Sequence, residues 1–277
     1  MKTLRCGRFQ LELDRPLIMG VVNVTPDSFS DGGRFATHKS AAAQAERLVA
    51  EGADLLDIGG ESSRPGAEPV SASEELARVL PVLEDVARLG VPVSVDTAKP
   101  EVMAAVIGGG AAMINDITAL QAGAALKAAA AADVGVCVMH MRGEPRTMQQ
   151  DPRYEDVVAE VAAFLAGRVA ALEAAGVDRG RIVVDPGFGF GKTLEHNLQL
   201  LRHLPRLRAL GVPVLAGLSR KSMLGKLTGR DVGERVHASV AAALCAAERG
   251  AAIIRVHDVA ATRDALTVWQ AAREGTA

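Results

Sequence analysis

The sequence predicts a (β/α)8 barrel, and three observations lead to this prediction. Short apolar or β-branched runs alternate with longer runs rich in Ala, Leu, Glu and Arg. The apolar runs are nearly continuous rather than interrupted at every second residue, which is typical of parallel strands buried on both faces. The alternation recurs eight times within 277 residues, a length that favours closure into a barrel over an open doubly wound sheet.

The predicted elements follow one another without a break. Residues 4–13 begin the chain with a β-hairpin that turns near residues 6–7. The predicted parallel strands are 17–22, 55–58, 91–95, 112–114, 135–139, 181–184, 213–218 and 252–256. Helical patterns such as 41–50, 73–89 and 155–175 lie between them, and several end at a Gly before the next strand, at positions 52, 90, 176 and 211. Glycine is expected there because it adopts the left-handed conformation without steric cost. No linker interrupts the pattern, so we expect residues 1–277 to form one domain.

Composition excludes several classes of function. With 31 basic and 33 acidic residues the net charge is −2, so no polycationic surface for nucleic acid or for an anionic membrane is expected. No apolar run reaches the length of a transmembrane helix, and the first residues lack the apolar core of a secretory signal. Cys6, Cys137 and Cys245 are odd in number and far apart, which argues against a disulfide framework or a zinc site. We therefore expect a cytoplasmic protein.

The stretch DPGFGFGK at residues 185–192 approaches two nucleotide-binding motifs and matches neither. A P-loop has four residues between its first Gly and the Gly-Lys pair, whereas Gly187 leaves only three. The dinucleotide fingerprint fails because its third Gly would come one position early. What remains is a strand that ends at Asp185, followed by a loop with few side chains. We expect Lys192 and Thr193 only to begin the next helix.

Polar residues follow every predicted strand at its carboxyl end, where barrels of this class place their active sites. A single Asp after a strand is more often a helix cap, and a single His more often a structural residue. Convergence of polar groups at all eight strand ends favours a functional site instead. In chain order these groups are Asn23, residues 59–64, Asp96, Asn115-Asp116, His140, Asp185, residues 219–221 and residues 255–257.

The first set of polar groups combines two carboxylates, an amide and an ammonium: Asp96, Asn115, Asp185 and Lys221. Paired carboxylates could act as an acid and a base, bind a hard metal, or accept from the N–H donors of a heterocycle. The presence of an amide and an ammonium beside them favours the heterocycle, because such a ligand offers donors and acceptors on one edge.

The second set suits an oxyanion such as phosphate, because it offers hydroxyl, guanidinium, imidazole and amide groups. Its members are Asn23, Ser63, Arg64, Arg255 and His257. Two long loops rich in Gly, Ser and Pro, at residues 25–36 and 59–71, are predicted to be lids over this end of the barrel.

Eight segments together resemble those of bacterial dihydropteroate synthases. They are NVTPDSFSDGG (23–33), GGESSRPGA (59–67), SVDT (94–97), IND (114–116), MHMRGEPRTMQ (139–149), DPGFGFGK (185–192), LSRKSM (218–223) and RVHDV (255–259). They occur in order from about residue 17 to the last helix, so the set is specific although no single motif is. The resemblance implies a (β/α)8 barrel, usually a homodimer, that joins 4-aminobenzoate to 7,8-dihydropterin-6-ylmethyl diphosphate, releases pyrophosphate and is the target of sulfonamides.

The resemblance also implies roles for individual residues. The pterin pocket corresponds to Asp96, Asn115, Asp185 and Lys221, and the pyrophosphate site to Arg255 and His257, with Asn23 as a Mg²⁺ ligand. The implied catalytic residues are Asn23, Arg64, Asp96, Lys221, Arg255 and His257. Further implied substrate contacts come from Ser63, Arg64, Met139, Phe190, Gly217 and Ser219, and the lids carry Thr25, Phe29, Ser30, Asp31 and Pro65. Ser63 stands where many members have Thr, which keeps the hydroxyl and loses a methyl group.

The chemistry implied by the resemblance needs no strong base, because an arylamine is already a neutral nucleophile at pH 7. The harder task is to stabilise the departing pyrophosphate and a developing pterin cation, so we expect an ionisation-first, SN1-like route with Mg²⁺. A methyltetrahydrofolate-dependent corrinoid methyltransferase shares a pterin-binding barrel but would have no use for the anion-binding set. A non-catalytic pterin-binding paralogue is a second alternative, against which the intact anion-binding set argues. A purely structural protein would not place polar groups at every strand end.

Overall fold

The predicted parallel strands form one barrel. The structure is a computed structural model that describes residues 2–24, 33–62 and 66–274. The strands are β3 (Leu17–Asn23), β4 (Leu55–Gly59), β5 (Val93–Asp96), β6 (Met113–Asp116), β7 (Gly135–Met139), β8 (Ile182–Asp185), β9 (Leu215–Ala216) and β10 (Ile253–Val256). They are ordered β8-β7-β6-β5-β4-β3-β10-β9. A parallel bridge between Val184 and Val214 brings the two outer strands of the sheet together, which confirms the predicted fold.

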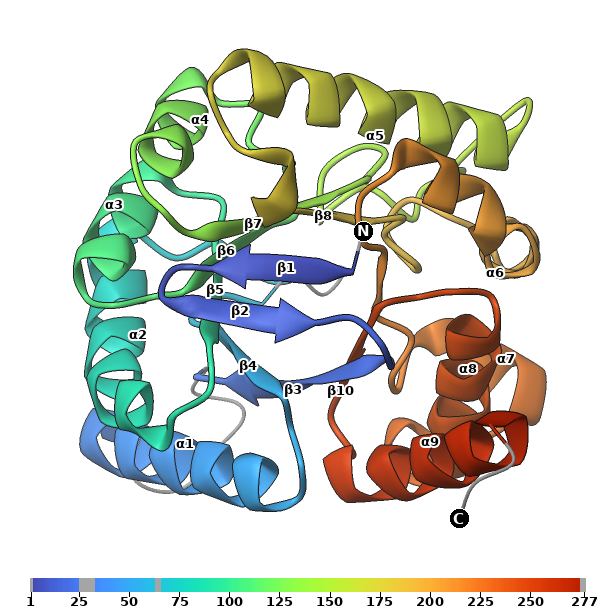
Figure 1. Ribbon diagram of the computed structural model, residues 1–277, viewed down its shortest axis with the longest axis horizontal. Helices are drawn as coiled ribbons and strands as arrows, with labels where there is room; N and C mark the ends of the chain where they lie inside the picture. Colours follow the sequence, from blue (N-terminus) through green and yellow to red (C-terminus); the bar gives the residue numbers. More distant parts are fainter. Residues whose placement is uncertain (1, 25–32, 63–65, 275–277) are drawn as a thin grey trace.

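Helices surround the barrel (Figure 1). They are α1 (Gly33–Ala50), α2 (Ala72–Val86), α3 (Pro100–Gly108), α4 (Gly123–Ala130), α5 (Val157–Ala174), α6 (Leu194–Arg202), α7 (Ser222–Thr228), α8 (Val236–Glu248) and α9 (Val259–Glu274), with 3-10 turns η2 (Ala87–Leu89), η3 (Arg179–Arg181), η4 (Leu204–Leu210) and η5 (Val232–Glu234). The predicted glycines after helices all have positive φ, from 71° at Gly211 to 97° at Gly52. Within the described part of the chain, no helix combines the length and the apolar character needed to cross a membrane.

The predicted N-terminal hairpin is confirmed and covers one end of the barrel. Its strands β1 (Thr3–Cys6) and β2 (Phe9–Glu12) pair antiparallel, and Figure 1 shows them lying across the middle of the ring of helices. Leu4 is fully buried against side chains inside the barrel, including Met113 and Ile253. These are the first residues of β6 and β10. The hairpin therefore closes the end of the barrel at which the strands begin.

The interior of the barrel is apolar at one end and polar at the other. In β4, Leu55 packs inside the barrel with the hairpin, whereas Leu56 packs between the strands and the helices. Because successive side chains point to opposite faces, Asp57 also points inward, and its register partner on β5 is Ser94. The barrel interior thus changes from hydrocarbon near the hairpin to polar groups toward the carboxyl ends of the strands.

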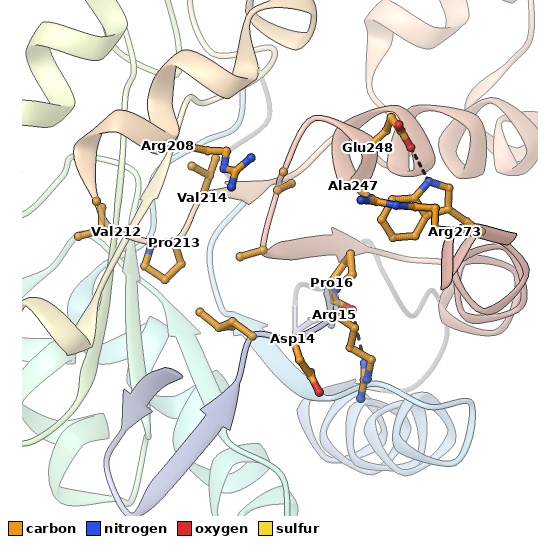
Figure 2. Close-up of a pocket in the computed structure, with 16 residues that line it drawn as sticks. Asp14, Arg15, Pro16, Arg208, Val212, Pro213, Val214, Ala247, Glu248 and Arg273 are labelled. Atoms are coloured by element: carbon orange, nitrogen blue, oxygen red, sulfur yellow. Dashed lines mark hydrogen bonds between the residues drawn. The ribbon is translucent and has the colours of Figure 1, made fainter. Parts of the chain in front are cut away.

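A groove of about 350 Å³ lies beside the hairpin, at the end of the barrel away from the polar layer. Figure 2 shows Pro16, which precedes β3, across the groove from Arg208 and the segment 212–214, which precedes β9. The third wall is formed by α8 and α9, where Trp269 Nε1 donates to Glu248 at 2.7 Å. Two of the walls come from segments at the starts of strands, and none of the lining residues is among the strand-end groups that the sequence singles out.

Leu4→Ala should lower the free energy of unfolding by about 2–5 kcal/mol, because it leaves a cavity in a fully buried layer. Gln10→Ala, at an exposed position of the same hairpin, is the matched control and should change it by less than about 0.5 kcal/mol. Urea unfolding followed by circular dichroism measures both. Similar small losses in the two variants would mean that the hairpin adds little to barrel stability.

Candidate active site

An ion cluster lies inside the carboxyl-terminal end of the barrel. The Arg255 guanidinium donates from Nε to Asp57 Oδ2 at 2.6 Å and from Nη2 to Asp96 Oδ2 at 3.2 Å. Asn115 Nδ2 donates to the same Asp57 oxygen at 3.1 Å. The Asp57 side chain is fully buried, whereas those of Asp96 and Arg255 are 17% and 22% exposed. A ligand at the mouth can therefore reach Asp96 and Arg255 but not Asp57.

The cluster changes the ionisation of its members. Burial, followed by the charge of Asp57, raises the pKa of Asp96, and Arg255 opposes both effects, so that the pKa of Asp96 is about 7. Burial by itself would lower the pKa of Arg255, but Asp57 and Asp96 together raise it above its ordinary value. The guanidinium therefore stays charged. The carboxyl group of Asp96, by contrast, has a pKa close to neutral pH.

Asp185 and Lys221 form the second part of the site. Asp185, the last residue of β8, accepts from the backbone N–H of Gly187 at 2.7 Å. Lys221 Nζ donates to the carbonyl oxygen of Phe188 and lies 4.4 Å from the centre of the Phe190 ring. Burial raises the pKa of Asp185 and lowers that of Lys221 to about 8, and the charges of the two groups oppose both shifts. A carboxyl group and an amine thus both contact the loop after β8 and interact with each other through their charges.

Glycines allow this loop to pack directly on backbone. Gly187 and Gly191 have φ of 67° and 62°, a conformation that L side chains rarely adopt. A Cβ atom at Gly187 would lie 2.0 Å from the carbonyl oxygen of His140, and one at Gly191 would lie 2.2 Å from that of Arg142. The glycine ladder therefore serves close contact between two strand-end loops, in place of either nucleotide-binding motif.

Lys192 does more than begin the next helix, and that prediction was wrong. Its side chain is 3% exposed. Its Nζ lies 3.0 Å from His140 Nδ1 and donates to the carbonyl oxygens of Gly187 and Phe190, both at 2.9 Å. Burial lowers the pKa of Lys192 and lowers that of His140 to about 3, with the neighbouring Lys192 charge adding to the effect on His140. A neutral His140 and the Lys192 amine together hold the loop that carries Phe190.

The start of α6 itself is as predicted. Thr193 is the N-cap, and its hydroxyl accepts from the backbone N–H of His196 while the His196 ring accepts from the Thr193 N–H. Sequence reasoning overlooked Lys192 because this helix start explained its position. A signal was present, however. A loop with few side chains leaves its carbonyl oxygens in need of donors, and Lys192 is the nearest one.

The remaining expected groups lie around the same end of the barrel. The Ser219 hydroxyl lies 3.0 Å from His257 Nδ1 and accepts from the His257 backbone N–H at 3.2 Å. Met139 is in register with Asp185 on the neighbouring strand. A Cβ at Gly217 would lie about 4 Å from both Arg255 and Asp185, so this glycine leaves space between the ion cluster and the second part of the site.

The last expected site residues are Asn23 and those of the two predicted lids. Asn23 ends β3, is partly exposed, and is in register with Gly59 of β4. Among the expected site residues, Thr25, Phe29, Ser30, Asp31, Ser63, Arg64 and Pro65 lie outside the described residues. Next to the second loop, Lys99 Nζ pairs with Glu61 and with the buried Glu75, and Glu61 accepts from the Val70 N–H at 3.1 Å. This network ties both ends of the loop to α2 and α3.

Asp57 is the site residue that sequence reasoning missed altogether. It lies within the strand LLDIG, which was interpreted as a continuous buried run because its apolar residues dominate. An acidic residue inside such a run is itself a signal, since a fully buried carboxylate requires a charged or hydrogen-bonding partner. Its partner, Arg255, lies 198 positions away in the chain.

Comparison with known proteins identifies the family. Residues 19–257 match a family model described as pterin binding enzyme. The chain belongs to this pterin-binding enzyme family. It is 56% identical over 272 residues to a dihydropteroate synthase from Neisseria meningitidis serogroup C, with 96% of each chain covered. By family it is a dihydropteroate synthase and therefore a transferase.

Solved structures of the family share the fold closely. The Xanthomonas albilineans dihydropteroate synthase with 4-aminobenzoic acid superimposes with a TM-score of 0.93 at 58% identity, covering 98% of both chains. The same enzyme in complex with 7,8-dihydropteroate gives a TM-score of 0.89 at 56% identity, again covering 98% of both chains. The pterin-binding barrel predicted from the sequence segments is confirmed.

Lys192→Met should loosen the loop after β8. The carbonyl oxygens of Gly187 and Phe190 would lose their buried donor, so amide hydrogen exchange across residues 187–190 should become at least tenfold faster. Lys127→Met, at an exposed position of α4, is the matched control and should leave these rates unchanged. Exchange measured by mass spectrometry checks both variants. Unaltered protection in Lys192→Met would show that the amine does not hold the loop.

Asp96→Asn should stabilise the fold at about pH 8 more than at about pH 5. The folded-state pKa of Asp96 is raised to about 7, above its ordinary value of about 4, so the folded protein keeps a proton that the unfolded chain releases. The contribution of Asp96 to stability is present below about pH 4 and is lost as the pH rises through about 7. The difference in unfolding free energy between variant and parent should grow over this range. A difference that is constant with pH, measured by urea unfolding, would contradict the raised pKa.

Proposed function

We propose that the protein condenses 7,8-dihydropterin-6-ylmethyl diphosphate with 4-aminobenzoate to give 7,8-dihydropteroate and pyrophosphate. The observation that carries this proposal is the polar layer at the carboxyl ends of the strands, where the buried Asn115 and Asp185 and the partly exposed Asp96 gather with Lys221. The complexes of the Xanthomonas albilineans enzyme with 4-aminobenzoic acid and with 7,8-dihydropteroate support the choice of substrates.

Pterin recognition follows from the donors and acceptors of this layer. One edge of a pterin carries N–H donors next to ring acceptors. Asp96 and Asp185 would accept from the donors, and Lys221 would donate to an acceptor. Desolvation raises the pKa of both carboxyl groups, and a ligand that donates to them favours their ionised forms. Binding of the pterin would therefore give both carboxyl groups further donors.

Pyrophosphate would bind at Arg255, His257 and Ser219. Arg255 is held between Asp57 and Asp96, so it stands at the boundary between the pterin pocket and the anion site. The two chemical sets inferred from the sequence would therefore be adjoining subsites that share this guanidinium. We expect substitution of Arg255 to weaken binding of the pterin ring as well as of its diphosphate, whereas His257 should act chiefly on the diphosphate.

Asn23 fits a supporting ligand of Mg²⁺. Its carboxamide oxygen is a hard donor at the mouth of the barrel, and Mg²⁺ commonly takes its other ligands from water and substrate phosphates. Within the described residues, no group of three or more His, Cys, Asp or Glu could hold a metal by itself. When bound, the ion would stabilise negative charge on the departing pyrophosphate.

The reaction would proceed by ionisation of the pterin before attack by the arylamine. Arg255 and His257 would bind the leaving group as its negative charge develops, and the carboxylates of Asp96 and Asp185 would stabilise positive charge on the pterin. The predicted lids would then exclude water, which competes with 4-aminobenzoate for the cation. No general base is needed, because the arylamine attacks as a neutral nucleophile.

A homodimer formed through one side of the barrel is part of the proposal. Large apolar side chains are exposed on α7, η5 and α9: Leu227 (53%), Val232 (55%) and Val268 (70%). Figure 1 shows α7, α8 and α9 grouped on one side of the ring. A second copy of the chain would bury this face. The cytoplasmic location and the single domain stay predictions.

Release of pyrophosphate by the purified protein tests the function. It should require both 7,8-dihydropterin-6-ylmethyl diphosphate and 4-aminobenzoate, and Asp185→Asn should reduce the rate at least tenfold, because an unpaired buried donor costs about 1–3 kcal/mol. A coupled pyrophosphate assay with each substrate alone provides the control. Pyrophosphate release at the full rate without 4-aminobenzoate would indicate a hydrolase, and pterin binding without any turnover would indicate the non-catalytic paralogue.

A further inference from the structure

Asp57 is fully buried in β4, yet it contacts two residues that face the proposed ligand. Its Oδ2 atom accepts from Arg255 Nε at 2.6 Å and from Asn115 Nδ2 at 3.1 Å. Its Oδ1 atom has no hydrogen-bond partner among the described residues. Because its side chain is shielded from the mouth, Asp57 can influence a ligand only through Arg255 and Asn115.

The contact with Asn115 fixes which atom of that amide faces outward. An ionised carboxylate accepts hydrogen bonds and cannot donate, and its short contact with the charged Arg255 is the kind made by an ionised group. The atom of Asn115 that points toward Asp57 must therefore be the NH2 group. The carbonyl oxygen of the Asn115 side chain is then left as the group directed away from Asp57.

This orientation completes a row of acceptors. Asp96 is the register partner of Asn115 on β5, and Asp185 ends β8 beyond β7. A ligand that donates to Asp96 and Asp185 favours their ionised forms, and the Asn115 oxygen then adds a third acceptor on this side of the pocket. Such a row suits a heterocycle edge with several N–H donors, and it disfavours one that places a ring nitrogen acceptor opposite Asn115.

We infer that Asp57 is a positioning residue, which directs the Asn115 oxygen toward the pterin and holds Arg255 at the boundary between the two subsites. The inference rests on the proposed function, because it concerns the same pocket. It goes beyond that proposal in naming a residue without substrate contact as the origin of the acceptor pattern. A purely structural Asp57 would affect folding but not the interdependence of ligand contacts.

A double-mutant cycle separates these roles. The probe is a pterin without diphosphate, and its affinity is measured by calorimetry in the full-length protein and in the variants Asp57→Leu, Asn115→Ala and the double variant. Asp57→Leu keeps the branching at Cγ and lacks the acceptor, so the Asn115 amide is free to turn. Each single substitution should weaken binding at least tenfold. The affinity of the double variant should be within about twofold of that of the single variant that binds the pterin more weakly, because Asp57 acts through Asn115.

Two controls make the cycle specific. Asp57→Asn can keep an acceptor oxygen at the position of Oδ2 and should bind the pterin within about threefold of the parent protein. Ser94→Ala removes a buried hydroxyl on the register partner of Asp57 and should leave the affinity unchanged within about twofold. The inference would be overturned if the double variant lost at least a hundredfold in pterin affinity, the product of the two single losses. Unchanged pterin affinity in a folded Asp57→Leu variant would also overturn it.

A measurement on the unsubstituted protein covers the case in which Asp57→Leu does not fold. The side-chain NH2 resonances of Asn115, assigned by their loss in Asn115→Ala, should exchange slowly with solvent both without and with the pterin. NH2 protons that become protected only when the pterin binds would mean that the amide points the other way, and the inference would be wrong. Failure of the parent protein to bind the pterin at all would instead reject the proposed function.

Discussion

The guanidinium of Arg255, held between two carboxylates inside the barrel, is the interaction on which the site depends. A carboxylate in the interior of a barrel is costly unless it is paired. Asp57 and Asp96 share one cation that does not lose its proton at any physiological pH. The pairing joins β4 and β5 to β10, the last strand of the chain, and therefore requires a barrel with β10 beside β3 and not an open sheet in the order of the sequence. The same contacts that form the site therefore depend on closure of the barrel.

Buried side-chain atoms without hydrogen-bond partners also lie in and near the site. Among the described residues, the buried side-chain oxygens without a partner are Asp57 Oδ1, Glu75 Oε1 and Ser94 Oγ. Two of them lie side by side in register on β4 and β5, and the third belongs to the residue that pairs with Lys99. Burial shifts the pKa of Asp96, Asp185 and Lys221 away from their ordinary values in the same region. Shifted pKa values gathered at one end of a barrel are typical of functional sites.

The sequence predicted the strands, the hairpin and the glycines after helices because each depends on local chemistry. Apolar runs bury themselves wherever they occur, and a glycine after a helix adopts positive φ whatever lies around it. The strand-end rule also placed Asp96, Asn115, Asp185 and Arg255 at the same end of the barrel. Periodicity could not reveal which of these groups touch. The contact of Arg255 with the acidic residues depends on the closure of the barrel, because closure brings distant segments together.

Two residues were missed for the same physical reason. Asp57 lies within an apolar strand and Lys192 at the start of a helix, so each position already had an adequate local explanation. Their partners are Arg255, which is far away in the sequence, and backbone carbonyl oxygens, which leave no trace in the identity of the residues that carry them. A charged residue at a position that becomes buried is the general signal for such cases, since burial of a charge demands a partner.

The hairpin across the starts of the strands has a consequence for the passage of molecules through the site. The interior of the barrel is packed with side chains, and the hairpin covers the end at which the strands begin. A molecule can therefore reach the polar layer only from the carboxyl ends of the strands and must leave by the same side. In the proposed reaction, a ring against Asp96 and Asn115 would lie deeper than a ligand at the loops. That ring would have to enter first and leave last, so the order of binding would follow from a barrel that is accessible at one end.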